Sequence, residues 1–210
     1  MSWLLHNWDQ VALGLGQHLV IAGSALAIGF LFSLAIGIPA ARNHRVFDVA
    51  MAVSGFLYTI PTLAFLALLI PVVGLGKANA IICMVAFSLM ILVRNIATGI
   101  REVPADITDA ARGMGMTASQ ILWRIELPLA LPVIVAGLRI AAVTVISVTV
   151  VAAYVNAGGL GTLIFNGIAS DHPPKIIAGA LAACLLAIAV DVSLAKVERS
   201  LKLRRTAPGA

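Results

Sequence analysis

Long apolar runs with few or no charged residues recur along this chain, and they constrain its fold more than any other feature. The first extends from Leu19 to Ala41 and ends at Arg42. As an α-helix it would be about 34 Å long at 1.5 Å per residue, enough to cross the ~30 Å hydrocarbon core of a bilayer. Further runs follow at Val49–Val73, Ala78–Val93, within Leu129–Val155, and from Ile176 to about Ala195. The pattern predicts an all-α, polytopic membrane helix bundle with about five transmembrane helices.

The composition excludes several other classes of protein. Of the 210 residues, 61% are hydrophobic and 11% are charged, whereas soluble domains average about 45–50% apolar and about 25% charged residues. A single soluble core of this size cannot bury so much apolar side chain and still present a polar surface. A disordered chain, a soluble enzyme domain and a disulfide-rich scaffold are therefore excluded. Cys83 and Cys184 lie in apolar runs without CxxC spacing, and we interpret both as small buried hydrophobic residues.

The distribution of basic residues predicts the orientation in the membrane. The net charge of +5 does not indicate nucleic-acid binding, because the cations separate apolar runs instead of forming one patch. If the N-terminus is outside, the outer segments hold Lys77 and Lys175, and Arg139 lies within the fourth run. The inner segments then hold Arg42, Arg45, Arg94, Arg101, Arg112, Arg124, Lys196, Arg199, Lys202, Arg204 and Arg205. The positive-inside rule therefore favours an outer N-terminus and an inner C-terminus.

This topology divides the chain into three parts. We expect an outer N-terminal segment (1–18), a transmembrane domain (19–195) that includes a cytoplasmic loop (94–128), and a basic cytoplasmic tail (196–210). Shorter loops are expected at 42–48, 74–77 and 156–175.

The first apolar run carries small residues at every fourth position, which place them on one helix face. They are Ala25, Gly29, Ser33 and Gly37. Small faces allow helices to approach closely in lipid, so the stripe predicts a tight helix–helix contact.

Pro61 interrupts the second run and is expected to kink its helix, because proline removes a backbone donor. Tyr58, Thr59 and Thr62 lie around this kink. Two interpretations remain open. These residues line a polar path through the membrane, or their hydroxyl groups bond back to the helix as packing at a proline kink.

The remaining charged and nucleophilic residues indicate no catalytic site. Arg139 and Asp191 lie nearest to bilayer depth, and we interpret both as structural residues close to the inner interface, Asp191 beside Lys196 and Arg199. We find no Ser/His/Asp arrangement and no metal-ligand cluster. His6, His18 and His44 are expected at loop edges, and His172 in an outer loop.

The loop 94–128 carries the most specific pattern. Pro104 favours the start of a helix. The carboxylates of Asp106 and Asp109 would stabilise this helix at the positive, N-terminal end of its dipole. Gly113 and Gly115 are expected to end that helix. Thr117 or Ser119 can cap a second helix, expected to run through Trp123 and stop before Pro128. The sequence therefore predicts two short helices that project from the membrane toward a soluble partner.

This loop resembles the EAA loop of ABC importer permeases. Asp109-Ala110-Ala111, Gly115, Ile125, Leu127 and Pro128 match the family pattern at every spacing, with Asp109 in place of the usual Glu. Thr59–Ala64 and Gly158-Gly159-Leu160-Gly161 are similar to segments of osmoprotectant permeases of the glycine betaine, carnitine and choline type. Thr162 stands where that subfamily usually has an acidic residue.

The resemblance implies a MetI-like fold and a division of labour in the bacterial cytoplasmic (inner) membrane. Two permease subunits, either copies of this chain or relatives, would form the pathway. A dimer of cytoplasmic ATPase subunits would receive Asp109, Ala110, Ala111 and Gly115. An extracytoplasmic binding protein would deliver the solute. ATP would be used by the partner, because this chain lacks a GxxxxGK[ST] phosphate loop, and no cofactor is expected on the chain itself. The expected partners also include membrane lipids but no nucleic acid.

The glycines Gly158, Gly159 and Gly161 could resemble a phosphate cradle, but on the outer side they favour a close backbone approach or a re-entrant turn beside the pathway. Three alternatives for the function remain open. The cargo is another small solute such as an amino acid or a sulfonate, or the chain is a secondary transporter or a membrane enzyme. A secondary transporter is disfavoured because the sequence shows neither an inverted repeat nor a series of buried acidic residues. An enzyme is disfavoured because the sequence shows no set of residues with a catalytic pattern.

Overall fold

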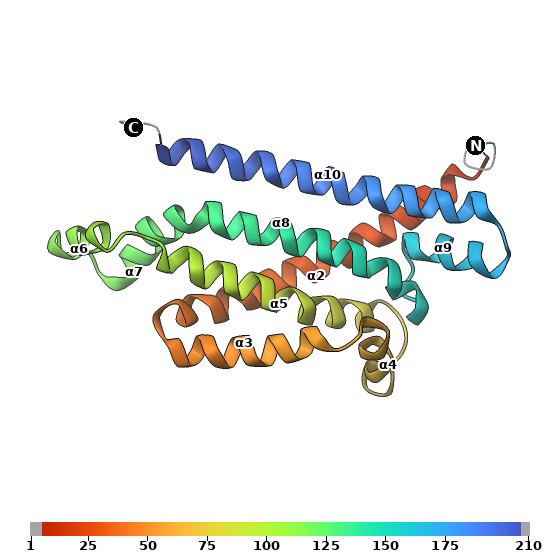
Figure 1. Cartoon of the computed structure of the whole chain (residues 1–210), viewed down its shortest axis with the longest axis horizontal. Helices are drawn as coiled ribbons and strands as arrows, with labels where there is room; N and C mark the ends of the chain where they lie inside the picture. Colours follow the sequence, from red (N-terminus) through yellow and green to blue (C-terminus); the bar gives the residue numbers. More distant parts are fainter. Residues whose placement is uncertain (1–5, 207–210) are drawn as a thin grey trace.

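The computed structural model describes residues 6–206, which are helical and contain no β-strand. The long helices are α2 (Trp8–Arg42), α3 (His44–Thr59), α4 (Thr62–Val73), α5 (Lys77–Arg101), α8 (Leu127–Val151) and α10 (Pro173–Thr206). The short ones are α6 (Ala105–Gly113), α7 (Ala118–Ile121), the π-helix η1 (Leu122–Glu126), the 3₁₀-helix η2 (Ala152–Val155) and α9 (Leu160–Ala169). Figure 1 shows α6 and α7 at one end of the molecule and α4 and α9 at the other.

The prediction of about five transmembrane helices is confirmed. Four helical segments of the described chain are each long and apolar enough to cross a membrane, namely 8–42, 77–101, 118–155 and 173–203. The bent pair α3 and α4 passes the same test as one broken span. The expected kink at Pro61 is thus a full break, with an angle of 99° between the two helices. Ile60 before the proline is extended (ψ 125°), as a residue before proline prefers, and this extended residue ends α3.

Several helix ends were predicted too far inside the apolar runs. α2 begins at Trp8, so most of the expected outer segment 1–18 continues the first span. The expected loop 42–48 shrinks to Asn43, whose side chain caps α3 by accepting from the backbone N–H groups of Arg45 and Val46. α10 continues through Thr206, so the tail 196–210 is helical as far as it is described. Hydropathy locates the bilayer-crossing part of a helix, whereas the backbone hydrogen bonds continue beyond it into water.

The small-residue face of α2 makes the predicted close helix contact, and its partner is α5. Ala25, Gly29, Ser33 and Gly37 are all buried. A Cβ atom added to Gly29 would lie 2.1 Å from Oγ of Ser88, and one added to Gly37 would lie 2.7 Å from Cγ2 of Ile96. Both contact residues belong to α5, so the glycines set the distance between these two helices.

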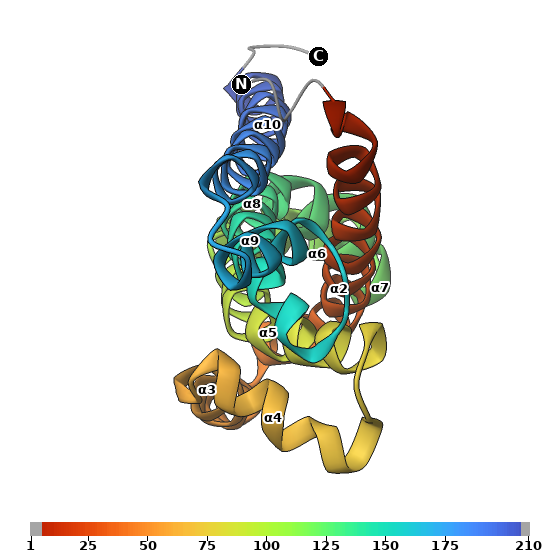
Figure 2. The same cartoon turned by 90° about the vertical axis from the view of Figure 1, so that its right-hand side faces the viewer.

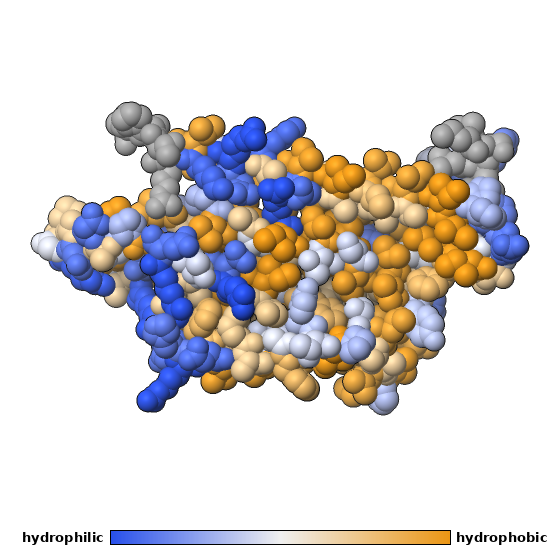
Figure 3. Space-filling model, in the orientation of Figure 1, coloured by the Kyte–Doolittle hydropathy of each residue, from blue (hydrophilic) through white to orange (hydrophobic). Residues whose placement is uncertain are grey.

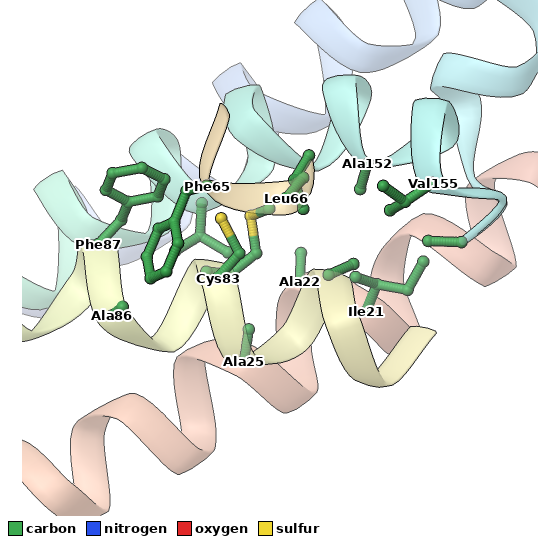
Figure 4. Packing of buried hydrophobic residues seen from close by; sticks show 14 of the residues in the cluster. Ile21, Ala22, Ala25, Phe65, Leu66, Cys83, Ala86, Phe87, Ala152 and Val155 are labelled. Atoms are coloured by element: carbon green, nitrogen blue, oxygen red, sulfur yellow. The ribbon is translucent and has the colours of Figure 1, made fainter. Parts of the chain in front are cut away.

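The main core lies near the α4 and α9 end of the molecule and joins α2, α4, α5, α8 and η2 (Figure 4). Figure 4 shows Phe65 of α4 directed toward Phe87 of α5, and their rings meet edge to face at 5.8 Å. α2 contributes Ile21 to the same cluster, and η2 contributes Val155. Cys83 is buried in this cluster, as predicted, but Cys184 is exposed on α10, so its predicted burial was wrong.

His18 corrects another prediction, because it lies inside α2 and not at a loop edge. Its side chain is fully buried, and Nε2 lies 3.0 Å from the carbonyl oxygen of Ile146 on α8. The helix begins earlier than the apolar run, which places this polar residue within the packed bundle.

Arg139 and Asp191 form an ion pair that the sequence did not predict. Nη2 of Arg139 on α8 donates to Oδ2 of Asp191 on α10 at 2.9 Å, and Nη1 lies 3.4 Å from Oε2 of Glu198. The expectation that Asp191 lies beside Lys196 and Arg199 considered neighbours on one helix alone. The pairing across two helices instead keeps both charges satisfied and joins α10 to α8.

Candidate functional site

α6 begins and ends as predicted and lies at the hydrophilic end of the molecule. Pro104 is its N-cap residue, Asp106 lies in its first turn, and the helix ends at Gly113. In Figure 3, hydrophilic residues gather at the end that carries α6, whereas hydrophobic residues dominate the middle of the visible face. The segment therefore projects beyond the apolar part of the bundle, where a soluble partner can reach it.

The turn after α6 needs glycine for its backbone conformation. Gly115 has φ +82°, which side chains strain to adopt. The Met116 N–H donates to the Ala111 carbonyl (3.1 Å), and the Gly115 N–H donates to the Arg112 carbonyl (2.9 Å). These two bonds form a Schellman motif. An added Cβ at Gly115 would meet no atom within 4 Å. The positive φ, and not crowding within the chain, is therefore what selects glycine here.

The second helix of the loop starts with a capping box. Oγ1 of Thr117 accepts from the Gln120 N–H at 3.3 Å, and Oε1 of Gln120 accepts from the Thr117 N–H at 2.8 Å. Of the two predicted caps, Thr117 is thus the one used.

The prediction that this helix stops before Pro128 is wrong. α7 continues through η1 into α8, and the Leu127 N–H bonds to the Leu122 carbonyl in the wider π pattern. Pro128 follows this π turn directly, so the continuous helix passes the residue that lacks an N–H without a break. Leu127 packs against a buried cluster that includes Ile100 and Ala130. Ile125 and Leu127 are half-buried, so these residues anchor the loop to the bundle.

The residues of α6 separate into an inner and an outer set, and the predicted coupling residues fall in both. Ala111 is 1% exposed and Thr108 is 8% exposed, so both face the protein. Asp109 and Ala110 are exposed. Both alanines were expected to let the helix sit in a partner's groove, and of the two Ala110 is the one that this chain leaves exposed. Oδ1 of Asp109 also lies 2.6 Å from Nη1 of Arg112, one helical turn later.

Two arginines make contacts between the first span and the predicted coupling loop (94–128). Arg42, the last residue of α2, donates from Nη2 to Oε2 of Glu126 at 2.9 Å. Arg101 donates to the carbonyl oxygens of Ala41 (3.0 Å) and Ala40 (2.6 Å) at the end of α2. Sequence reasoning counted these cations for topology but missed their partners. A carboxylate within the otherwise apolar segment Ile125–Leu127 was the one available signal that Glu126 needs a cation.

A hollow of about 490 Å³ lies between the predicted coupling loop (94–128) and the end of α2. Arg42, Glu126 and Arg112 line it, together with Met116, Ala118 and Ile121. The hollow lies beside the Arg42–Glu126 ion pair.

The predicted pathway residues lie at the opposite end of the molecule. Tyr58 is 42% exposed, and its ring meets the ring of Phe87 edge to face at 5.7 Å. Oγ1 of Thr59 donates to the Phe56 carbonyl at 2.7 Å, which favours the packing interpretation for this residue. Pro61 precedes α4, and Thr62 is its first residue.

The glycine turn at 158–161 makes the close backbone approach that was predicted. Gly158 and Gly159 both have φ +89°. The Gly159 N–H donates to Oε1 of Gln17 on α2 at 2.9 Å. A Cβ added to Gly161 would lie 1.8 Å from the Val150 carbonyl oxygen, so α9 folds back directly onto α8. Among the described residues no cluster of three or more His, Cys, Asp or Glu could hold a metal ion.

The chain belongs to the family described as binding-protein-dependent transport system inner membrane component, whose model matches residues 20–203. It is 39% identical over 198 residues to the carnitine transport permease protein OpuCB of Listeria monocytogenes, with 94% of this chain and 91% of that protein covered. It is 33% identical over 199 residues to the glycine betaine/carnitine/choline transport system permease protein OpuCB of Bacillus subtilis, with coverages of 95% and 92%. A third relative is the osmoprotectant import permease protein OsmW of Salmonella typhimurium, 35% identical over 203 residues, with 94% of each chain covered.

The fold has a close structural counterpart. A chain of the MetNI methionine ABC transporter in an inward-facing conformation superposes with a TM-score of 0.82 at 22% identity, covering 96% of this chain and 97% of that chain. The expected MetI-like fold is confirmed. The family and the fold together identify the chain as a multi-pass permease of the inner membrane, which is a membrane subunit and not an enzyme.

Proposed function

We propose that this chain is the permease subunit of an ATP-driven importer for a small osmoprotectant of the betaine, choline or carnitine type. Three relatives of similar length, each at least 33% identical, carry names that specify carnitine, glycine betaine with carnitine and choline, or osmoprotectants. The single observation that carries this proposal is their agreement over nearly the whole chain.

We propose further that α6 couples this chain to a cytoplasmic ATPase dimer, which uses the ATP. The exposed Asp109 and Ala110, the Gly115 turn and the anchored segment Ile125–Pro128 support this role. A second permease subunit, identical or related, would complete the pathway, and an extracytoplasmic binding protein would deliver the solute. No cofactor bound to this chain is needed for these roles.

The proposed orientation has the N-terminus outside and the C-terminus inside. The arginines at the α6 end support it, because Arg42, Arg101 and Arg112 gather where α2 and α5 end. We propose that Tyr58, Pro61 and Thr62, with the Gly158–Gly161 turn, lie beside the pathway near the outer surface. The break at Pro61 supports this placement, because irregular backbone at membrane depth is tolerated where protein or a wet cavity surrounds it.

Competition uptake by the assembled transporter tests the cargo. Unlabelled betaine, choline or carnitine should suppress uptake of at least one labelled member of this set, whereas an amino acid or a sulfonate should not. Uptake should also disappear when the partner ATPase is deleted and persist when ion gradients are collapsed. Uptake that follows the ion gradient would support a secondary transporter. Selective suppression by the amino acid or the sulfonate would overturn the osmoprotectant assignment alone.

A further inference from the structure

An apolar groove of about 500 Å³ runs between α2 and α3, with α5 as its floor. Ile36 of α2 and Leu89 and Val93 of α5 line one side, and Val49 and Val53 of α3 line the other. In Figure 2, α3 lies at the edge of the bundle, on the side away from α10. Ser54 is the buried residue of α3, and the rest of this helix is partly or fully exposed. The groove is therefore on the outside of this chain, at membrane depth.

One end of the groove is basic. Arg45 lines it in the first turn of α3, nine residues before Ser54. At 1.5 Å per residue the lined stretch is about 13 Å long, close to the thickness of one hydrocarbon leaflet. The guanidinium thus lies where phosphate groups of that leaflet are found, and the apolar walls extend from it toward the bilayer centre.

Arg45 differs from Arg42 and Arg101, which lie at the same end of the bundle. Arg42 is paired with Glu126, and Arg101 donates to the last carbonyl groups of α2. Within residues 6–203, the Arg45 guanidinium takes part in none of the ion pairs. Asp48 lies three residues after Arg45, at a neighbouring position of the helix surface, but it does not line the groove and forms no ion pair with Arg45. The positive end of the α3 dipole adds to the charge of Arg45.

We propose that this groove binds one anionic phospholipid, with an acyl chain along α3 and the phosphate at Arg45. A long apolar groove with a cation at its interfacial end matches the two parts of such a lipid. A second protein copy fits less well, because close helix contacts in membranes favour small residues, and the rim here carries branched Val49 and Val53, which are 63% and 57% exposed. In the proposed orientation the lipid belongs to the inner leaflet.

Quenching by brominated lipids tests this site. The native tryptophans are replaced by phenylalanine, and Val53→Trp places a reporter in the groove. Ile188→Trp, at an exposed apolar position of α10, serves as the matched reporter outside it. Each full chain, purified with its co-purifying subunits, is reconstituted in mixtures of phosphatidylglycerol and phosphatidylcholine, with bromine on one or the other. Both variants must retain the helical content and elution volume of the parent.

We expect phosphatidylglycerol to compete about fivefold better than phosphatidylcholine at Val53→Trp, the preference that one basic residue contributes near anionic lipid. At Ile188→Trp the two lipids should quench almost equally. Adding Arg45→Gln should abolish the preference, whereas Arg199→Gln, an exposed arginine of α10, should preserve it. Equal quenching at both reporters, a preference that survives Arg45→Gln, or a reporter in the groove that neither lipid reaches would overturn the proposal. The last result would indicate that protein covers the groove.

Discussion

Nη2 of Arg42 lies 2.9 Å from Oε2 of Glu126, and this pair joins the end of α2 to the π-helix that leads into α8. The Glu126 side chain is 12% exposed and that of Arg42 is 46% exposed. Two spans far apart in sequence thus meet beside the proposed coupling segment. A force on α7 and η1 would reach α2 through this contact as well as α8 through the chain.

Arg42→Ala should therefore destabilise the protein by about 1–3 kcal/mol, because it leaves the nearly buried Glu126 carboxylate without its cation. Glu126→Gln combined with Arg42→Ala should recover part of this loss, because the remaining group is neutral. Arg124→Ala, an exposed neighbour, is the control and should stay within about 0.5 kcal/mol. Thermal unfolding in detergent measures all three. A loss for Arg124→Ala equal to that for Arg42→Ala would refute a specific pair.

The Gly115 turn predicts a contrast between two substitutions. Gly115→Ala should destabilise the α6–α7 hairpin by about 1–2 kcal/mol, because φ +82° is unfavourable for a side chain. Gly115→Asn should cost less, since asparagine tolerates this region better. Hydrogen exchange at Met116, whose N–H bonds to Ala111, reports the turn directly. Equal protection in both variants would contradict the conformational account.

The contact between α2 and α5 predicts different effects for two glycines of the same helix. Gly37→Ala should lower stability by about 1–3 kcal/mol, because the new Cβ would lie 2.7 Å from Cγ2 and 2.9 Å from Cβ of Ile96. Gly23→Ala places its Cβ in open space and should be neutral or stabilising. The difference in unfolding temperature between the variants is the readout, and similar values would argue against the packed seam.

Asp109 should matter for docking more than for stability. Its pair with Arg112 joins two exposed side chains, so losing it should cost about 0–1 kcal/mol. Asp109→Lys should nevertheless abolish transport and ATPase co-purification, because it reverses the charge offered to the partner. Asp109→Glu keeps the charge and should be mild. Normal transport by a stably inserted Asp109→Lys protein would remove Asp109 from the proposed contact.

The parts of the fold that depend on local pattern were predictable from the sequence. Apolar runs located the spans, and glycine at 115 with threonine at 117 marked the turn and the cap of the coupling loop. The stripe that contains Gly29 and Gly37 predicted a close helix contact, although its partner α5 emerged only from the structure.

The parts that depend on distant residues were not predictable in the same way. Arg139 and Asp191 are 52 positions apart, and hydropathy does not indicate which helices are neighbours. His18 is buried because α2 begins at Trp8, before the apolar run. The polar residues in this first part of α2 gave no hydropathy signal for a helix that tertiary packing stabilises. Likewise, Pro128 marks a helix end by local rules, yet the π turn at η1 accommodates it without a break.

Site-specific cross-linking between α6 and the partner ATPase tests the central claim most directly. Both native cysteines are first removed by Cys83→Ala and Cys184→Ala. In this background Ala110→Cys presents a thiol on the exposed face of α6. Ala111→Cys, at a position that is 1% exposed, presents a thiol on the face toward the bundle. The proposed coupling predicts that a short bifunctional thiol reagent joins Ala110→Cys to the ATPase subunit, with a yield that changes when ATP is added, and leaves Ala111→Cys unjoined. Equal cross-linking of both variants, or none for Ala110→Cys in a complex that still transports, would contradict it.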